Sequence, residues 1–263
     1  SIIIFFQFNL KLNIKFNCIT FVILILSLNI FNDTSKMDLH SPYQNVSVKF
    51  NNNQLVPITV QSNNIWLQTP IDLSNEINQQ KNSAWHKFYI IPFTSTNYDF
   101  KDILIVGSGT GNDVATAIRY SEGNIDAVEI DPLVANLGEK FHPENPYSNP
   151  RVNLIINDAR NFIKEIDKKY DLIVYSVLDS HANLSSKGGV RLDSYVYTVE
   201  SFYEAKKKLN ENGVMFLSFA VSTEQMGNKI FKMLKMNFDK EPKILTRTYE
   251  TDDKNFIEGI YSF

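Results

Sequence analysis

A glycine-rich turn and the carboxylates that follow it are the residues of this chain whose types and spacing suit chemistry. The turn, Gly107-Ser-Gly-Thr-Gly111, follows an apolar run at residues 103–106. Glycines there allow backbone conformations that a Cβ forbids, and they let a ligand approach the bare main chain. Glu129 ends the next apolar run, eighteen positions after Gly111, where a carboxylate can accept both hydroxyls of a ribose. The pattern predicts a nucleoside-binding site.

Further polar side chains follow the next two apolar runs. Asp158, within Asn157-Asp-Ala159, comes after the first of them, where a carboxylate can accept from an adenine amino group. Asp179 and His181 come after the second. Ligands of open parallel sheets bind outside the carboxyl ends of the strands, so we expect these side chains to converge on the glycine turn.

Each of these residues also has a structural alternative. Glu129 and Asp158 could cap the helices that follow them, and His181 could be a hydrogen-bonded structural residue. Because ligand binding at strand ends is characteristic of such sheets, we favour binding roles for the two carboxylates. For His181 both alternatives stay open.

Alternating strand and helix patterns from Lys101 onward supply the frame for these side chains. Strands are predicted at 103–106, 125–130, 152–156, 171–177 and 213–219, and helices near 112–121, 132–140, 159–166, 197–209 and 223–235. Such alternation predicts a parallel α/β sheet with helices on both faces. Two more strand-like runs, at 243–249 and 256–263, would add an antiparallel pair. A Rossmann-like sheet finished in this way is the class I architecture of methyltransferases that use S-adenosylmethionine.

A small β-rich lobe is predicted before this domain. Alternating runs at 46–50, 56–60 and 65–68 predict two short hairpins. Residues 73–91 predict one helix, capped by Ser74 and ended by Pro92. Residues 32–42 have the composition of a polar linker, and Asn212-Gly213 predicts a turn before the fifth strand. The predicted division is 1–36 for a hydrophobic segment and linker, 37–100 for the lobe and its helix, and 101–263 for the nucleoside-binding domain.

The first residues of the chain are strongly apolar. The run at 18–31 is close to the shorter limit of a membrane span and predicts a transmembrane helix. A signal peptide is one alternative, although no small-residue cleavage site follows. A core helix is another, although the run lacks a polar face. Lys11 and Lys15 favour a cytoplasmic N-terminal side, whereas a cytosolic nucleoside donor favours a membrane-anchored protein with a cytoplasmic catalytic domain.

Composition excludes several classes of function. The net charge is −3 with mixed signs, so no nucleic-acid-binding footprint is present. The single cysteine, Cys18, excludes an internal disulfide. The four histidines are scattered, with no Cys/His cluster at metal-ligand spacing, so no metal site is predicted.

Six motifs, in order and at matching spacing, resemble those of one family. They are Ser41-Pro-Tyr-Gln44, Trp85-His86, Ile105-Val-Gly-Ser-Gly-Thr-Gly111, Val128-Glu-Ile-Asp131, Asn157-Asp-Ala159 and Tyr170-Asp-Leu-Ile-Val174. Over roughly residues 41–219 the chain resembles the spermidine synthases, or polyamine aminopropyltransferases, and in particular their membrane-anchored relatives.

The resemblance implies a donor, an acceptor and a set of donor-binding residues. The donor would be decarboxylated S-adenosylmethionine, the acceptor a small-molecule amine, and the assembly a homodimer. Glu129 would hold the ribose of the donor and Asp158 its adenine. The full set of donor-binding residues would be Gln44, His86, Gly107, Gly109, Thr110, Gly111, Glu129, Asp158 and Ala159.

Two departures from the family pattern bear on the chemistry. The glycine turn of the family usually contains an aspartate that grips the aminopropyl ammonium of the donor, and this chain has Thr110 there. The family base that deprotonates the attacking amine corresponds to Ser176, and only the second aspartate of that motif, Asp179, remains. A serine hydroxyl has no useful basicity near neutral pH. Asp113, His181 or Asp193 could substitute, and Asp179 is the favoured residue for binding or deprotonating the acceptor.

The segment 185–200 is predicted to be a lid over the acceptor site. Gly188-Gly189 gives it freedom to move, and Asp193 and Tyr195 give it groups that could bind an acceptor. The alternative is a plain surface loop before a helix capped by Thr198. Long loops in compact domains are usually functional, which favours the lid.

Aminopropyl transfer to a polyamine is the leading functional hypothesis. Methyl transfer from S-adenosylmethionine is the second, because Thr110 in place of aspartate would relax selection against the carboxylate of that donor. A nucleoside-binding domain without turnover, serving a membrane partner, is the third, supported by Ser176 at the position of the base. An NAD-dependent dehydrogenase fits least, because it has no place for the Asn157-Asp-Ala159 motif.

Overall fold

The computed structural model describes residues 35–63, 65–178, 196–221, 224–238, 240–249 and 258–262. The chain divides into two compact units, residues 1–37 and 38–263. Almost all of the predicted membrane segment, residues 1–34, lies outside the described residues. Within the described ranges, no helix is long and apolar enough to cross a membrane.

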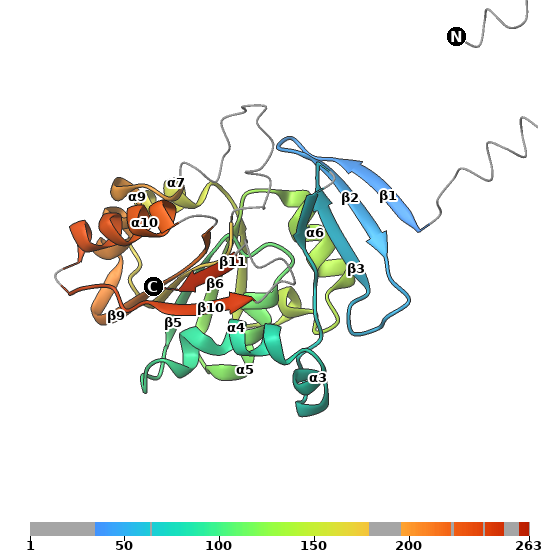
Figure 1. The fold of residues 1–263 in the computed structure, drawn as a ribbon, viewed down its shortest axis with the longest axis horizontal. Coiled ribbons are helices and arrows are strands. Elements are labelled where there is room, and N and C mark those ends of the chain that lie inside the picture. The colour runs from blue at the N-terminus through green and yellow to red at the C-terminus, as the bar shows by residue number, and fades with distance from the viewer. Residues whose placement is uncertain are drawn as a thin grey trace, which may run out of the picture. The chain divides into compact units, whose positions relative to one another are not determined.

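The larger of two sheets has seven strands and is predominantly parallel (Figure 1). Its strands are β5 (Asp102–Val106), β6 (Asn124–Glu129), β7 (Val152–Ile156), β8 (Tyr170–Tyr175), β9 (Leu209–Val221), β10 (Leu245–Tyr249) and β11 (Glu258–Ser262). Their order is β10-β11-β9-β8-β5-β6-β7, with β11 antiparallel to both of its neighbours. The predicted parallel sheet and its antiparallel ending are confirmed.

Continuous apolar runs place β5 and β8 in the middle of this sheet. The side chains of residues 103–106 are fully buried, and every residue of β8 is buried. Strands covered by helices on both faces have this composition, without the alternation of a strand that faces water. The apolar core therefore lies on both sides of the two central strands.

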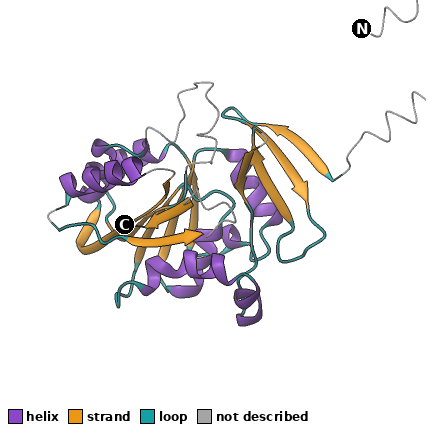
Figure 2. Cartoon of the chain, in the orientation of Figure 1, coloured by secondary structure: helices purple, strands orange, loops and turns teal. Residues whose placement is uncertain are grey.

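Helices cover the two faces of the sheet (Figure 2). They are α5 (Asn112–Tyr120), α6 (Pro132–Phe141), α7 (Ala159–Glu165), α9 (Val199–Lys207) and α10 (Glu224–Asn237), with a short 3-10 helix, η1 (Pro146–Ser148). Helices α7, α9 and α10 pack together over one core cluster, and α5 packs over another with α4 (Ser83–Thr94). Asp131 and the predicted N-cap Thr198 each accept a backbone amide of the helix that they begin.

The smaller sheet has four strands in the order β1-β2-β3-β4. They are β1 (Lys36–His40), β2 (Asn45–Phe50), β3 (Ile58–Ser62) and β4 (Ile65–Gln68). Val46, Val48, Ile58 and Val60 are fully buried and form one cluster with Leu137 of α6. Figure 1 shows α6 beside β2 and β3. The linker predicted at 32–42 is wrong over 36–40. These residues form β1, which pairs with β2 at the edge of the smaller sheet.

The helix predicted at 73–91 is two helices, α3 (Glu76–Lys81) and α4 (Ser83–Thr94). Asn75 caps α3 by accepting from the Asn78 amide, whereas the Ser74 hydroxyl donates to Asp72. Pro92 lies inside α4 and does not end it. A proline removes the hydrogen bond to the residue four positions earlier and crowds the carbonyl of that residue, and α4 ends two residues after Pro92.

The turn predicted at Asn212-Gly213 lies inside β9, where the register against β8 shifts between Tyr170 and Leu172. A Cβ added to Gly213 would lie 3.0 Å from the Asn210 amide nitrogen, so the chain turns sharply there. The extra residues of β9 are accommodated at this irregularity.

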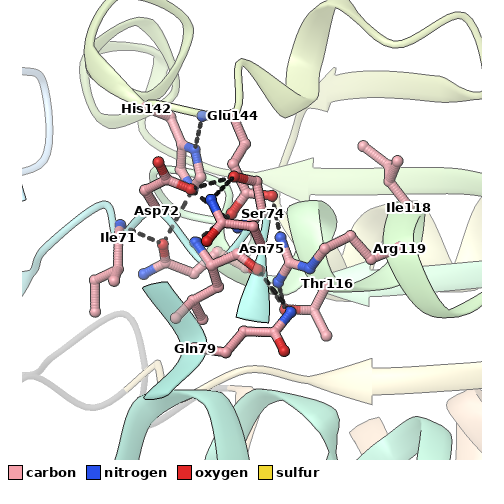
Figure 3. Close-up of polar contacts among 12 residues, drawn as sticks. Ile71, Asp72, Ser74, Asn75, Gln79, Thr116, Ile118, Arg119, His142 and Glu144 are labelled. Atoms are coloured by element: carbon pink, nitrogen blue, oxygen red, sulfur yellow. Dashed lines mark hydrogen bonds and ion pairs between the residues drawn. The ribbon is translucent and has the colours of Figure 1, made fainter. Parts of the chain in front are cut away.

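A polar network fixes the segment that runs from β4 to α3 (Figure 3). The Glu144 carboxylate accepts from the Leu73 amide at 2.9 Å and pairs with the Arg119 guanidinium. The Glu144 amide donates in turn to Nδ1 of His142 at 3.1 Å. The connection between the two sheets is thereby held against α5 and the end of α6, and the relative position of the sheets depends on it.

Candidate functional site

The glycine turn follows β5, and all three of its glycines adopt left-handed backbone conformations. Their φ angles are +73° for Gly107, +57° for Gly109 and +105° for Gly111, a region that residues with a Cβ rarely adopt. The amides of Gly107 and Ser108 both donate to the Val128 carbonyl, at 2.9 and 3.0 Å. The turn is therefore attached to the end of β6, one residue before Glu129.

Glu129 is buried and braces this turn. Its Oε2 accepts from the Gly109 amide at 2.8 Å, and its Oε1 accepts from the Asp131 amide at 2.9 Å. Burial raises the pKa of Glu129, and these two amides partly offset the rise. Asp131, and not Glu129, caps α6. Each carboxylate oxygen keeps a further lone pair, so Glu129 can still accept from a ligand.

Asp131 joins the lobe to the end of β6. Its Oδ2 accepts from the Ser41 hydroxyl at 2.7 Å and from Nε2 of Gln44 at 2.9 Å. The Oε1 of Gln44 accepts from the Ser62 hydroxyl at 2.6 Å. Gln44 therefore binds Asp131, the residue two positions after Glu129. Both the nitrogen and the oxygen of its side-chain amide are hydrogen-bonded. The sequence did not predict this docking role of Asp131, which appeared there only as the last residue of a family motif.

Gln68, at the end of β4, reaches the glycine turn from the lobe. Its Oε1 accepts from the Thr110 amide at 2.6 Å and from the Thr110 hydroxyl at 2.9 Å. A Cβ added to Gly109 would lie 2.3 Å from this oxygen. Sequence reasoning missed Gln68, and its position as the last residue of the lobe sheet was the one signal for it.

Asn112, directly after the turn, is another residue that the sequence did not single out. Its Nδ2 donates to the Thr69 carbonyl and to the Tyr89 hydroxyl, both at 2.9 Å. Its Oδ1 accepts from the Ile71 amide and contacts Nε2 of His142 at 3.0 Å. Because Nδ1 of His142 accepts a backbone amide, Nε2 carries the proton, and burial lowers the pKa of this neutral ring to about 3.

Asp113 and Ser176 meet where β5 and β8 end. Asp113 is in the first turn of α5, and burial raises its pKa to about 6, an effect that the nearby Ser176 hydroxyl partly offsets. Ser176 is 4% exposed, and among the described residues its Oγ forms no hydrogen bond of normal geometry. The Tyr197 hydroxyl holds the strand end here, accepting from the Leu178 amide at 3.1 Å.

Asp158 lies beyond β7 and caps α7, whose first residue is Ala159. Its Oδ1 accepts from the amides of Arg160 and Asn161 at 2.8 and 3.2 Å. The capping alternative for Asp158 is therefore present in the structure. The other oxygen, Oδ2, is not part of the cap, so this role does not exclude contact with a ligand.

His86 is not brought to the glycine turn. Its Nε2 is 2.8 Å from the hydroxyl of Tyr120, the last residue of α5, whereas the turn precedes α5. Burial and the charge of Arg119 lower the pKa of His86. Tyr89, one turn further along α4, is the residue of this helix that contacts Asn112 behind the turn.

Four predicted residues lie outside the described residues. They are Asp179, His181, Asp193 and Tyr195. The same holds for most of the predicted lid, of which residues 196–200 are described. Their assignments to the acceptor site stay predictions.

Comparison with known proteins gives this arrangement a family. Residues 91–251 match the spermine/spermidine synthase domain. A polyamine aminopropyltransferase of Buchnera aphidicola subsp. Acyrthosiphon pisum is 30% identical over 169 residues, 62% of this chain and 54% of that protein. One from Clostridium perfringens is 29% identical over 142 residues, 53% of this chain and 47% of that protein. The chain thus spans about half the length of these curated relatives.

Solved structures agree on the fold. A spermidine synthase in complex with the transition state analogue AdoDATO superposes with a TM-score of 0.60 at 15% identity, covering 86% of this chain and 72% of that one. The Thermotoga maritima spermidine synthase gives 0.59 at 15% identity, covering 86% and 71%. With the match over 91–251, these findings identify the chain as a member of the spermine/spermidine synthase domain family.

Proposed function

We propose that this protein transfers an aminopropyl group from decarboxylated S-adenosylmethionine to a polyamine acceptor. The observation that carries the proposal is the buried Glu129 carboxylate, which holds the Gly109 amide of a three-glycine turn in a chain of this family. A carboxylate in this place is suited to the paired hydroxyls of a ribose. The relatives named polyamine aminopropyltransferase support the group transferred.

The residues of the site fit a nucleoside donor. Glu129 has lone pairs left for the ribose hydroxyls, and Oδ2 of Asp158 is available to the adenine amino group. The bound donor supplies a sulfonium, whose neighbouring carbon an amine can attack in line. The task of the chain is to align the two reactants and to accept one proton. Asp179, Asp193 and Tyr195 are proposed to bind the acceptor amine.

Methyl transfer from S-adenosylmethionine is the second candidate, and one observation favours it. The Thr110 amide and hydroxyl both donate to a single oxygen, Oε1 of Gln68. Two donors that converge on one oxygen are also suited to a carboxylate, the group that distinguishes S-adenosylmethionine from its decarboxylated form. Displacement of Gln68 would let Thr110 bind that carboxylate.

Localisation and assembly are proposed on the sequence alone. We propose that residues 18–31 anchor the protein in a membrane, with the domain at 101–263 in the cytoplasm and a homodimer as the assembly. Fractionation of the full chain, followed by protease protection of closed vesicles, tests the anchor and its orientation. Sedimentation in detergent tests the dimer.

Calorimetry of the full-length protein against both donors tests the proposed function. We expect the decarboxylated donor to bind more tightly than S-adenosylmethionine. Tighter binding of S-adenosylmethionine would contradict the proposal in favour of methyl transfer. Binding of a donor without turnover on any of a panel of diamines and polyamines would leave a nucleoside-binding domain.

A further inference from the structure

The side chains of Asp113 and Ser176 meet at the place in the large sheet where successive strands begin to be added on the opposite side of β5. Strands β5 and β8 pair in parallel as far as Val106 and Tyr175. The next residues are Gly107, which opens the glycine turn, and Ser176. The order β8-β5-β6 makes this the switch point of the sheet, where open α/β sheets bind their ligands. Asp113 of α5 lies there beside the Ser176 hydroxyl.

The carboxylate of Asp113 differs from the other three around the site. Glu129 accepts from two backbone amides that shape the turn, and Asp158 accepts from two at the start of α7. Asp131 caps α6 and holds the lobe. The groups that lower the pKa of Asp113 are its own amide and the Ser176 hydroxyl, and neither belongs to the cap of another helix or to the attachment of the lobe. Asp113 is therefore the one acid of the four with no evident task in holding the fold.

The surroundings of Asp113 also suit proton transfer. Burial is the main cause that brings its pKa to about 6, within reach of neutral pH. The neighbouring titratable group of η1 is the Tyr147 phenol, which senses the charges of both Asp113 and Glu129 and whose pKa is raised by burial. From β8 the neighbour is Ser176, whose hydroxyl is buried without a normal hydrogen bond in the described part of the chain. That hydroxyl can donate to Asp113 once the carboxylate is charged.

We propose that Asp113 is the general base of the transfer reaction and accepts the proton of the attacking amine, with Ser176 as its positioning residue. This inference rests on the proposed function. The ammonium form of the acceptor gives one proton to Asp113, and the freed lone pair forms the new nitrogen–carbon bond. The carbon–sulfur bond breaks, its electron pair goes to sulfur, and the sulfonium becomes a neutral thioether. The product is a secondary ammonium, and Asp113 ends protonated.

The test compares single-turnover rates of the full-length protein and three variants over a range of pH, with putrescine as acceptor. Asp113→Asn should lower the rate on the order of 100-fold or more, a usual contribution of general-base catalysis, while donor affinity measured by calorimetry stays within about threefold. Ser176→Ala should move the midpoint of the acid limb to higher pH, because the hydroxyl that stabilises the charged form is lost. Asp99→Asn, at an exposed position, is the matched control and should leave the rate unchanged.

A double variant tests the proposal by recovery of activity, in addition to its loss in the single variants. Ser176→Asp should restore much of the rate in the Asp113→Asn background, because it places a carboxylate at the neighbouring position. Asp113→Asn with an unchanged rate and pH profile would overturn the assignment and leave the proposed function intact. Absence of transfer by the unmodified protein would remove the proposed function and the assignment together.

Discussion

The four carboxylates around the glycine turn have different partners, and their partners decide their roles. Glu129 holds the turn, Asp131 holds the lobe, Asp158 caps α7, and Asp113 has mainly the Ser176 hydroxyl beside it. The sequence predicted Glu129 and Asp158 at strand ends because Glu129 ends one apolar run and Asp158 lies two residues after another. The sequence could not distinguish a ligand-binding carboxylate from one that stabilises a turn or a helix start. The backbone amides that donate to these carboxylates come from turns, and no sequence pattern specifies where those amides lie.

Removal of the Glu129 carboxylate should greatly weaken donor binding. Glu129→Ala leaves the Gly109 and Asp131 amides without their acceptor and removes the group that we propose holds the ribose. We expect the affinity for either donor, measured by calorimetry, to fall on the order of 100-fold, as when a charged hydrogen-bonding partner is lost. Glu122→Ala, at an exposed position, is the control. Unchanged affinity of the Glu129 variant would mean that the nucleoside binds elsewhere.

The partly buried Asp113 carboxylate should make the protein less stable as pH rises. Its folded pKa, about 6, lies above the usual value of 3.8. The folded state therefore holds the proton more tightly, and the stability this gives is complete below pH 3.8 and lost as pH rises through 6. Asp113→Asn should raise the free energy of unfolding on the order of 1–3 kcal/mol at pH 8.

Urea denaturation at pH 8 and at pH 4 measures this effect. The gain from Asp113→Asn should shrink at pH 4, where the carboxyl of the unmodified protein is neutral in the folded state. If Asp113→Asn lowered the free energy of unfolding equally at both pH values, the charged form of this carboxylate would not destabilise the fold.

At the scale of elements, most strands of both sheets could be read from the sequence. The predicted strands at 103–106 and 152–156 differ from β5 and β7 by at most one residue, and those at 46–50 and 65–68 differ from β2 and β4 by at most one. Apolar residues dominate these runs, which gives each of them a strong strand pattern. The missed strand β1 is a short polar edge strand, with four of its five residues exposed. Edge pairing of this kind depends on a neighbouring strand and leaves little trace in local composition.

The hydrogen bond between Gln44 and Asp131 should help to hold the lobe against the rest of the domain. Gln44→Ala leaves Asp131 with one donor fewer and the Ser62 hydroxyl without its acceptor. We expect a loss of about 1–3 kcal/mol in the free energy of unfolding. Hydrogen exchange should increase in β2 and β3 before it increases in β5. Tyr43→Ala, at a side chain that is 45% exposed, is the control, and equal exchange in both variants would contradict a docking role.

His142 should make the protein sensitive to acid. Its folded pKa, about 3, lies below the usual value of 6.5. The unfolded state therefore binds the proton more readily, and stability falls as pH drops below 6.5, by up to about 1.4 kcal/mol per pH unit. His142→Gln should reduce the difference between the urea midpoints at pH 7 and pH 5. A difference as large as in the unmodified protein would mean that another group controls the acid response.

At the scale of the molecule, the site combines groups from both sheets. Gln68 and Gln44 reach the turn and its flanks from the lobe, across sequence separations of 42 and 87 residues. The order of motifs predicted the family, which the match over residues 91–251 confirms, and the position of the nucleoside stays a prediction. The contacts of Gln68, Asn112 and Asp113 could not be predicted, because they depend on how the lobe docks against α6 and on how α5 leaves the turn.

The identity of the transferred group is the central claim, and product analysis tests it most directly. The full-length protein is incubated with putrescine and an equimolar mixture of decarboxylated S-adenosylmethionine and S-adenosylmethionine, and the acceptor is analysed by mass spectrometry. The proposed function predicts that putrescine gains an aminopropyl group while methylthioadenosine accumulates. Methylated putrescine with S-adenosylhomocysteine, or an acceptor left unchanged, would contradict it.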